Sequence, residues 1–222
     1  MKLNFFFAFL LAALLSSSAF GQKTTKVVYN MSMASDNPQM ESMKSMFEGS
    51  KLEVLANDKF CRANVTLGSL TTTSTIIDAT THNAILLMTS MAGNMAMKLN
   101  ADDLKKQDAQ QNEFAVTLID SVKEIAGYSC KKAIMTTDDS MQFDMWYTTD
   151  LKIGDLSGTP LEYDKIPGVP LEFSMHKGPV TMKCTATTID LNATVDSSTF
   201  DMTIPDGYKL MNLDDLKKMG GQ

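Results

Sequence analysis

Residues 51 to 99 contain five short runs rich in apolar and β-branched residues, and only a few turn-forming residues separate one run from the next. The runs are 51–56, 60–67, 70–78, 84–91 and 95–99. Such composition and length predict β-strands. Breaks this short allow only antiparallel neighbours, because parallel neighbours need a crossover of about a dozen residues or more. This half of the chain therefore predicts an antiparallel meander.

The same pattern extends to both sides of the meander. From Lys26 onwards, apolar and polar residues alternate, with Val27, Tyr29, Met31 and Met33 on one side of the predicted strand. Further strands are expected over 114–119, 125–135, 141–147, 171–175 and 180–186, and capped helices over 37–49, 100–110 and 211–220. We predict one domain, residues 22–222, built on an antiparallel sheet of about ten strands. A sheet this large usually curls, and short helices on its concave face would enclose an apolar space.

The N-terminus is typical of a secretory signal peptide. Residues 1–21 carry one basic residue, Lys2, then an apolar run from Phe5 to Leu15, and end in the small residues around Ala19 and Gly21. The apolar run is shorter than the roughly 20 residues that a membrane-spanning helix needs, and no later stretch approaches that length. No cysteine lies near the expected cleavage point. We expect an exported protein, periplasmic or secreted, with no lipid anchor and no transmembrane segment.

Charge and cysteine content exclude several function classes. Without residues 1–21, the chain keeps 19 basic and 26 acidic residues, a net charge of −7, and Arg62 is its single arginine. Nucleic acid is therefore not an expected partner, because phosphate binding needs clustered basic residues. Three cysteines allow at most one internal disulfide, whose pairing stays open, and all three could equally stay reduced and buried; they are Cys61, Cys130 and Cys184.

No catalytic signature stands out in the sequence. The two histidines, His82 and His176, fall in turn-like segments and belong to no paired metal spacing. Neither a nucleophile elbow nor a phosphate-binding glycine loop is present. Adjacent acid pairs such as Asp102 and Asp103 point in different directions rather than toward one substrate atom. We expect a protein that is not an enzyme and that needs no cofactor.

Five phrases in the second half resemble a known family. IAGYSCKKAIM, MWYTTDL, IPGVPLEFSM, MKCTATTID and FDMTIPDGYKLM occur in this order between residues 125 and 211, a little under half of the expected mature chain. The set resembles the DUF4412 family of exported bacterial proteins, and it is similar to GLPGLI proteins and to the LolA/LolB-like group. That resemblance implies a curved antiparallel half-barrel with helices over a cavity that holds acyl chains. Arg62 is the only arginine available to secure such helices, but a surface arginine on a strand is the favoured interpretation.

The methionines pose the sharpest functional question. Met40, Met43 and Met46 recur every three residues in the helix predicted for 37–49, and thioethers are ligands that Cu(I) favours. On a helix, however, Met40 and Met43 share a stripe with Phe47, while Met46 drifts to its edge. A metal site needs ligands focused at one point, whereas the other methionines are spread over many strands. Unbranched methionine also suits a surface that adapts to varied apolar ligands.

We therefore expect a lipid or other lipophilic small molecule to bind in a methionine-rich apolar cavity, with residues 38–48 as part of its cover. Alternatives left open are an ordinary methionine-rich core, a Cu(I) site at Met40 and Met43, and a structural envelope protein without a ligand. The sequence identifies no protein partner. The residues expected to line the cavity are Met31, Met33, Met40, Met43, Phe47, Met95, Met97, Met141, Phe143, Met145, Phe173, Met175 and Met182.

Overall fold

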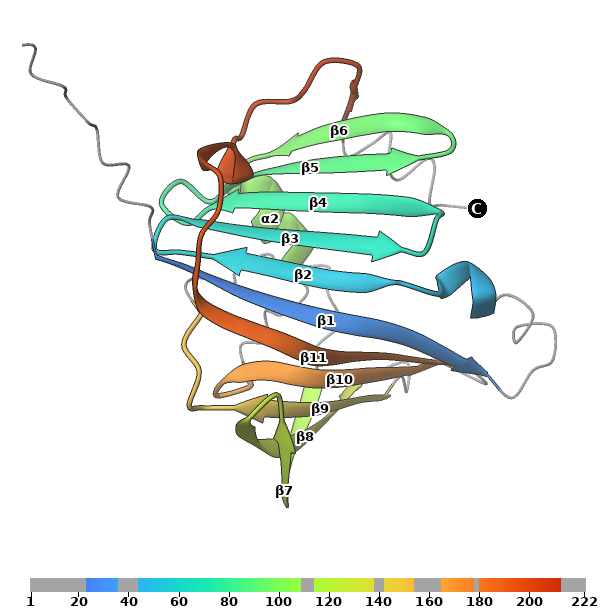
Figure 1. The fold of residues 1–222 in the computed structure, drawn as a ribbon, viewed down its shortest axis with the longest axis vertical. Coiled ribbons are helices and arrows are strands. Elements are labelled where there is room, and N and C mark those ends of the chain that lie inside the picture. Colours follow the sequence, from blue (N-terminus) through green and yellow to red (C-terminus); the bar gives the residue numbers. More distant parts are fainter. Residues whose placement is uncertain are drawn as a thin grey trace, which may run out of the picture.

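The described residues form one sheet of twelve strands (Figure 1). The computed structural model describes residues 23–35, 44–108, 114–137, 142–153, 165–177 and 180–212. The strands are β1 Thr24–Ser35, β2 Lys51–Ala56, β3 Phe60–Leu67, β4 Thr71–Asp78, β5 Asn83–Ser90, β6 Gly93–Leu99, β7 Phe114–Ile125, β8 Tyr128–Thr137, β9 Gln142–Thr148, β10 Val169–Lys177, β11 Val180–Ala193 and β12 Lys209–Met211. The helices are η1 Lys44–Phe47, α2 Ala101–Asp108 and η2 Ser197–Phe200.

Strand β1 joins two antiparallel meanders at the centre of the sheet. The spatial order is β12-β6-β5-β4-β3-β2-β1-β11-β10-β9-β8-β7. Every neighbouring pair is antiparallel except β12 and β6, which are parallel. Parallel pairing is possible there because the chain travels from β11 to the far edge of the sheet before it forms β12. The predicted meanders are confirmed, but the sheet has twelve strands rather than about ten.

The β7–β8 hairpin differs from its predicted boundaries. Residue Ile125 ends β7 and pairs with Tyr128, whereas the sequence pattern placed it at the start of a new strand. The two residues between them, Ala126 and Gly127, have φ values of 49° and 83°. Positive φ at both central residues matches the right-handed twist of the flanking strands, so the turn closes a tight hairpin.

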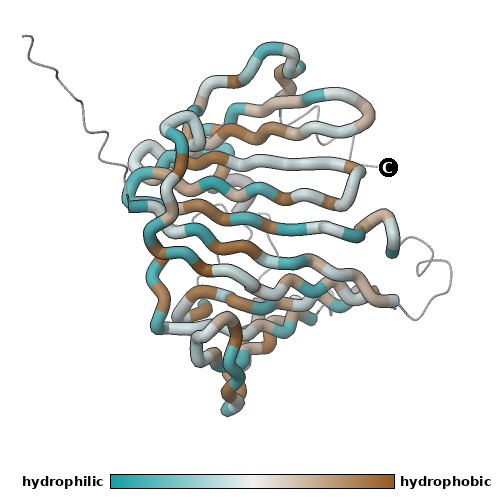
Figure 2. The backbone as a smooth tube through the Cα atoms, viewed as in Figure 1, coloured by the Kyte–Doolittle hydropathy of each residue, from teal (hydrophilic) through white to brown (hydrophobic). Residues whose placement is uncertain are grey.

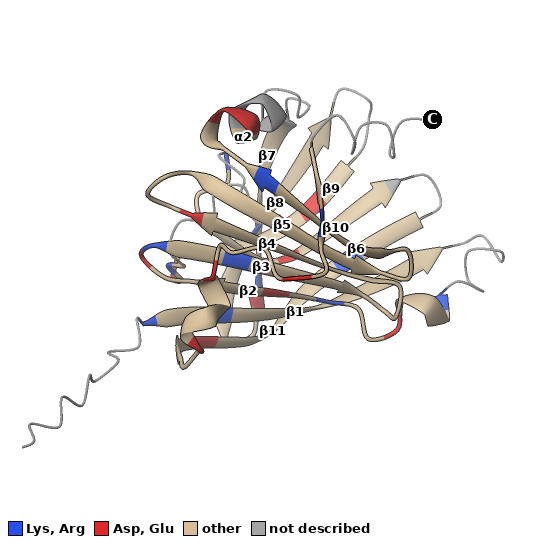
Figure 3. Ribbon diagram, turned by 90° about the horizontal axis from the view of Figure 1, so that it is seen from above, with Lys and Arg blue, Asp and Glu red and all other residues tan. Residues whose placement is uncertain are grey.

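The two faces of the sheet differ in polarity and curvature. Pleating places successive side chains on opposite faces, and Figure 2 shows hydrophobic and hydrophilic residues alternating along the strands. Figures 1 and 3 show a curled sheet, whose two ends bend to the side on which α2 lies. The concave face carries the main buried cluster, which includes Tyr29, Val54, Ala63 and Leu171. The opposite face, which carries Arg62 and Asn64, is called the convex face below.

Helix α2 packs on the concave face near β6. Asn100 caps it, because its side-chain oxygen accepts hydrogen bonds from the backbone N–H groups of Asp102 and Asp103 at 2.9 and 3.0 Å. Leu104 then packs against a cluster formed by Ile77, Ala84, Met97 and Leu99. The helix predicted for 100–110 is thus confirmed over Ala101–Asp108. None of the helices in the described ranges is long and apolar enough to cross a membrane.

The predicted set of helices over the concave face is not confirmed. Of the helix expected over 37–49, residues 36–43 lie outside the described part, and η1 forms one short 3-10 turn at the end of β1 and β2 (Figure 1). Its position is set by the β3–β4 turn, where Gly68, with φ 49°, lies against the backbone of Met46. Most of the helix expected over 211–220 also falls outside the described residues, and β12 ends at Met211.

Candidate functional site

The strand methionines gather on the concave face in two rows that cross the lower half of the sheet. In one row, Met33 pairs with Met182, Met182 with Met175, Met175 with Phe143, and Phe143 with Met135. The second row lies two residues away along each strand and consists of Met31, Cys184, Phe173, Met145 and Ala133. Cross-strand partners lie on one face with their side chains in contact range. The structure therefore brings together side chains that the alternation placed on separate predicted strands.

These rows are partly core and partly accessible. Met33 and Met145 are buried, and so is Met97 on the other half of the same face. The remaining described members of the predicted set on the strands are half-buried, namely Met31, Met95, Phe143, Phe173, Met175 and Met182. Phe173 packs against Tyr29 with ring centroids 6.0 Å apart. The accessible members leave apolar surface on the concave face.

Three predicted residues and the copper alternative fall outside what the structure describes. Met40, Met43 and Met141 lie in undescribed segments. Phe47 is half-buried in η1, while Met46 is 42% exposed, so the described part of this segment follows the expected polarity. The turn η1 lies where β1 ends and β2 begins, and it contacts β1. The Cu(I) alternative at Met40 and Met43 therefore lies outside the described residues.

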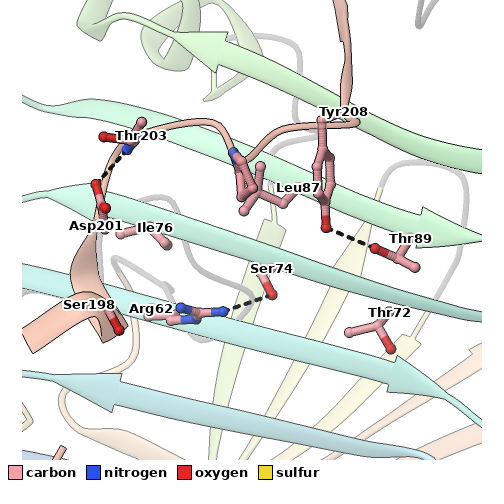
Figure 4. Close-up of a pocket in the computed structure, with 11 residues that line it drawn as sticks. Arg62, Thr72, Ser74, Ile76, Leu87, Thr89, Ser198, Asp201, Thr203 and Tyr208 are labelled. Atoms are coloured by element: carbon pink, nitrogen blue, oxygen red, sulfur yellow. Dashed lines mark hydrogen bonds between the residues drawn. The ribbon is translucent and has the colours of Figure 1, made fainter. Parts of the chain in front are cut away.

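A pocket of about 370 Å³ lies on the convex face (Figure 4). Its floor comes from β3, β4 and β5, through Arg62, Thr72, Ser74, Ile76, Leu87 and Thr89. Its wall comes from residues 194–208, which leave β11 and cross over these strands, and which we call the strap (Figure 1). The strap residues that line the pocket are Ser198, Asp201, Thr203, Pro205 and Tyr208.

Arg62 is held in place at the bottom of this pocket. Its Nε donates to Asn64 Oδ1 at 2.8 Å, and its Nη1 donates to the backbone oxygen of Thr199 at 2.7 Å. A longer contact of 3.4 Å joins Nη2 to Ser74 Oγ, whose hydroxyl also donates to Asn64. Arg62 is half-buried. Arg62 lies on a strand and is partly exposed, as the favoured interpretation expected, but it also connects the sheet to the strap.

Two further contacts fix the strap above the sheet. The ring of Phe200 stacks on Phe60 with centroids 5.7 Å apart. Tyr208 lies with its hydroxyl 2.9 Å from Thr89 Oγ1 (Figure 4). Hydrogen bonds from the side chain and the backbone N–H of Thr203 lower the pKa of Asp201. Asp201 is therefore a carboxylate at neutral pH.

A buried carboxylate lies elsewhere on the convex face. Glu172 on β10 accepts hydrogen bonds from Lys123 Nζ at 2.9 Å, Lys183 Nζ at 3.1 Å and Thr185 Oγ1 at 3.1 Å. Burial by itself raises the pKa of Glu172, but the bonds from Lys123 and Lys183 outweigh burial and hold the pKa below its usual value. Lys123 Nζ also lies 5.4 Å from the centroid of the Trp146 ring. Because every charge here has a partner, this cluster serves stability.

The cysteines and histidines show no sign of chemistry. All three cysteines are buried and none is in a disulfide, which agrees with the reduced alternative. Burial raises the pKa of Cys130 to about 11 and that of Cys184 to about 12. His82 lies in a turn as expected, but His176 lies within β10, where it contacts Thr181 Oγ1 at 3.1 Å. The described residues contain no group of three or more His, Cys, Asp or Glu that could hold a metal ion.

The convex pocket is the feature that the sequence analysis missed. Arg62, Asn64 and Ser74 occupy the polar positions of alternating strands, which by pattern alone indicate a hydrated face. The pocket exists because the strap returns across three strands, and no short motif reports such a return. The turn-forming residues Pro205 and Gly207 were the only local signal that the chain does not continue as a strand.

Comparison with known families gives one match that covers most of the chain. The family described as "N-glycanase peptide, N-terminal domain" matches residues 27–203. The DUF4412 family expected from residues 125–211 is not the family found. No curated protein matches the sequence.

Solved structures agree with the family match at the level of the fold. A structure of PNGF-II is 16% identical, with a TM-score of 0.53, and the alignment covers 89% of this chain but 33% of that chain. This chain thus spans about a third of the PNGF-II chain. LolA-type neighbours score lower. The Mycobacterium tuberculosis lipoprotein LppX is 10% identical, covering 77% of this chain and 89% of its own, with a TM-score of 0.36. A LolA superfamily protein from Nitrosomonas europaea is 11% identical, covering 82% and 91%, with a TM-score of 0.31. Scores this low carry no argument about ligands.

Proposed function

The chain belongs to the family of N-glycanase N-terminal domains, and we propose that it is an exported, non-enzymatic protein that binds a lipid or other lipophilic molecule on its concave face. Residues 1–21 serve as the export signal in this proposal. The function is a binding function because the site consists of apolar side chains that offer surface rather than reacting groups.

The two methionine rows are the observation that supports lipophile binding. In these rows Met175, Met182, Phe143 and Phe173 are half-buried, and Met145 on the same face is fully buried. A core that is filled by its own side chains leaves such residues no accessible surface. Methionine has three rotatable bonds and a polarizable sulfur, so a methionine surface adapts to acyl chains of different shape.

The energy of such binding comes from removing apolar surface from water. Covering about 300 Å² of apolar surface is worth roughly 7 kcal/mol at about 25 cal/mol per Å², before the costs of ordering ligand and side chains. That corresponds to binding at micromolar concentrations or weaker. The rows run across five neighbouring strands of the sheet, β1, β11, β10, β9 and β8.

Native mass spectrometry of protein purified from its own host envelope tests the proposal. We expect a bound lipophilic mass, or uptake of added fatty acid or phospholipid. The double variant Met175→Gln, Met182→Gln should lose uptake, because glutamine keeps the length of methionine but is polar. Met91→Gln is the matched control, since Met91 is 92% exposed in the β5–β6 turn. A ligand-free protein that takes up neither probe would refute lipophile binding and leave an ordinary core or a structural envelope role.

Glycan cleavage is the competing function, and the family description is the observation that favours it. The chain spans about a third of PNGF-II. Among the described residues, the charged side chains that line the convex pocket are Arg62 and Asp201. Incubation with an N-glycosylated peptide separates the two functions. Unchanged glycopeptide mass agrees with a non-enzymatic protein, whereas release of the glycan would overturn that part of the proposal.

A further inference from the structure

The convex pocket offers both hydrogen-bond donors and acceptors that are fixed in space. A guanidinium has five N–H groups, and the three contacts of Arg62 use three of them. Two N–H groups of Arg62 thus have no partner among the described residues. On the opposite wall, the Asp201 carboxylate accepts from Thr203, and a carboxylate has room for further donors.

Opposed charges in the pocket select against charged ligands. An anion drawn to Arg62 would be repelled by Asp201, and a cation drawn to Asp201 would be repelled by Arg62. A neutral molecule with several hydroxyl groups meets neither penalty. Each of its hydroxyls can accept from Arg62 or donate to Asp201. The Thr72 hydroxyl can donate or accept, whereas the Ser198 hydroxyl already donates to Asp196 and can accept.

Apolar surface in the same pocket suits the carbon face of such a ligand. Ile76 and Leu87 lie in the floor, while Tyr208 lies in the wall (Figure 4). Pro205 of the strap also lines the pocket. The volume, about 370 Å³, lies at the lower end of the range of roughly 300–1,000 Å³ for small-molecule sites. That size fits one sugar ring or a disaccharide, in which C–H faces alternate with hydroxyl edges.

We infer that the pocket between β3–β5 and the strap is a binding site for a neutral sugar. Arg62 donates to ring or hydroxyl oxygens, Asp201 accepts from hydroxyl groups, and the Tyr208 ring packs against the C–H face. The contacts of Phe200 with Phe60 and of Arg62 with Thr199 hold the wall in place, so the site is formed before the ligand arrives. The site lies on the face opposite the methionine rows and does not depend on lipophile binding there.

Titration of isotope-labelled protein with neutral methyl glycosides, followed by amide chemical shifts, tests the site. The panel contains methyl glucoside, galactoside, mannoside and N-acetylglucosaminide, with glucuronate and glucosamine as charged counterparts. We expect saturable shifts from at least one neutral glycoside at amides of β3–β5 and the strap. Asp201→Asn keeps an oxygen for the Thr203 N–H but loses the charge, and should weaken binding about tenfold or more.

A second variant and a matched control keep the test independent of folding. Thr72→Val removes a hydroxyl at an exposed strand position and should weaken binding several-fold at unchanged melting temperature. Thr117→Val makes the same change on β7, at the other end of the sheet, and should leave binding unchanged. The inference is overturned if no neutral glycoside binds, if only a charged sugar binds, or if both pocket variants bind as tightly as the original chain.

Discussion

Removing the two sides of the Glu172 ion cluster should give unequal losses of stability. In Glu172→Gln the carboxylate is lost and Lys123 and Lys183 remain. In the double variant Lys123→Met, Lys183→Met the carboxylate remains, and among the described side chains Thr185 still donates to it. Methionine keeps most of the apolar stem of lysine, so packing against Trp146 is retained.

The expected magnitudes follow from exposure. The side chains of Lys123 and Lys183 are 40% and 43% exposed, whereas that of Glu172 is 8% exposed. In Glu172→Gln the two lysine side chains can be hydrated instead, so the loss of their shared partner lowers the free energy of unfolding by about 1–2 kcal/mol. A carboxylate left buried without its counter-charges costs about 3–5 kcal/mol. The double lysine variant should therefore be the less stable protein by about 1–4 kcal/mol.

The stability of the original chain and that of the double lysine variant should respond to pH in opposite directions. In the original chain the folded-state pKa of Glu172 lies below its unfolded value, so its contribution is present above the unfolded pKa and is lost as pH falls through the folded pKa. Without the lysines, burial raises the folded pKa above the unfolded value. The penalty is then full above the folded pKa and is relieved as pH falls toward the unfolded one.

Urea unfolding at pH 7 and pH 4 measures both effects, with Glu172→Gln as the reference without a titrating group. Lys98→Met, a change of an exposed lysine on β6 of the same face, is the control and should shift stability little. Equal destabilisation by the two variants at pH 7 would refute the argument from exposure. A difference in the free energy of unfolding between the two variants that is larger at pH 4 than at pH 7 would refute the assigned pKa shifts.

Three other predictions concern the backbone and the core. Gly68→Ala should lower the free energy of unfolding by more than about 1–2 kcal/mol, because φ is positive there and a Cβ would meet the Met46 carbonyl; urea unfolding measures it. Tyr29→Phe should cost about 1–2 kcal/mol in the same assay, because the buried Tyr29 hydroxyl donates to the Pro170 oxygen at 2.8 Å; an unchanged midpoint would contradict this. Thiol reagent at pH 8 should label the native protein slowly and the urea-unfolded protein rapidly. The reason is that Cys61, Cys130 and Cys184 are all buried, and the pKa values of Cys130 and Cys184 are raised.

Much of the fold could be predicted because its signals are local. Alternation along each run decides which side chains share a face, and the pleat turns that pattern into two surfaces without further information. For this reason the described strand methionines of the predicted set, from Met31 to Met182, do lie on one face. The cap at Asn100 predicted α2 for the same reason, since its bonds reach only two or three residues along the chain.

The sequence by itself thus determined most of the strands and their facing pattern, but not β12 or the full length of β7. Tertiary structure alone decided that β1 lies between β2 and β11, that η1 lies at a strand end, and that a pocket forms on the convex face. The contact of Arg62 with Thr199 spans 137 residues, and that of Thr89 with Tyr208 spans 119. Contacts so distant in sequence depend on how all the intervening strands pack, because no local preference of either residue selects its partner.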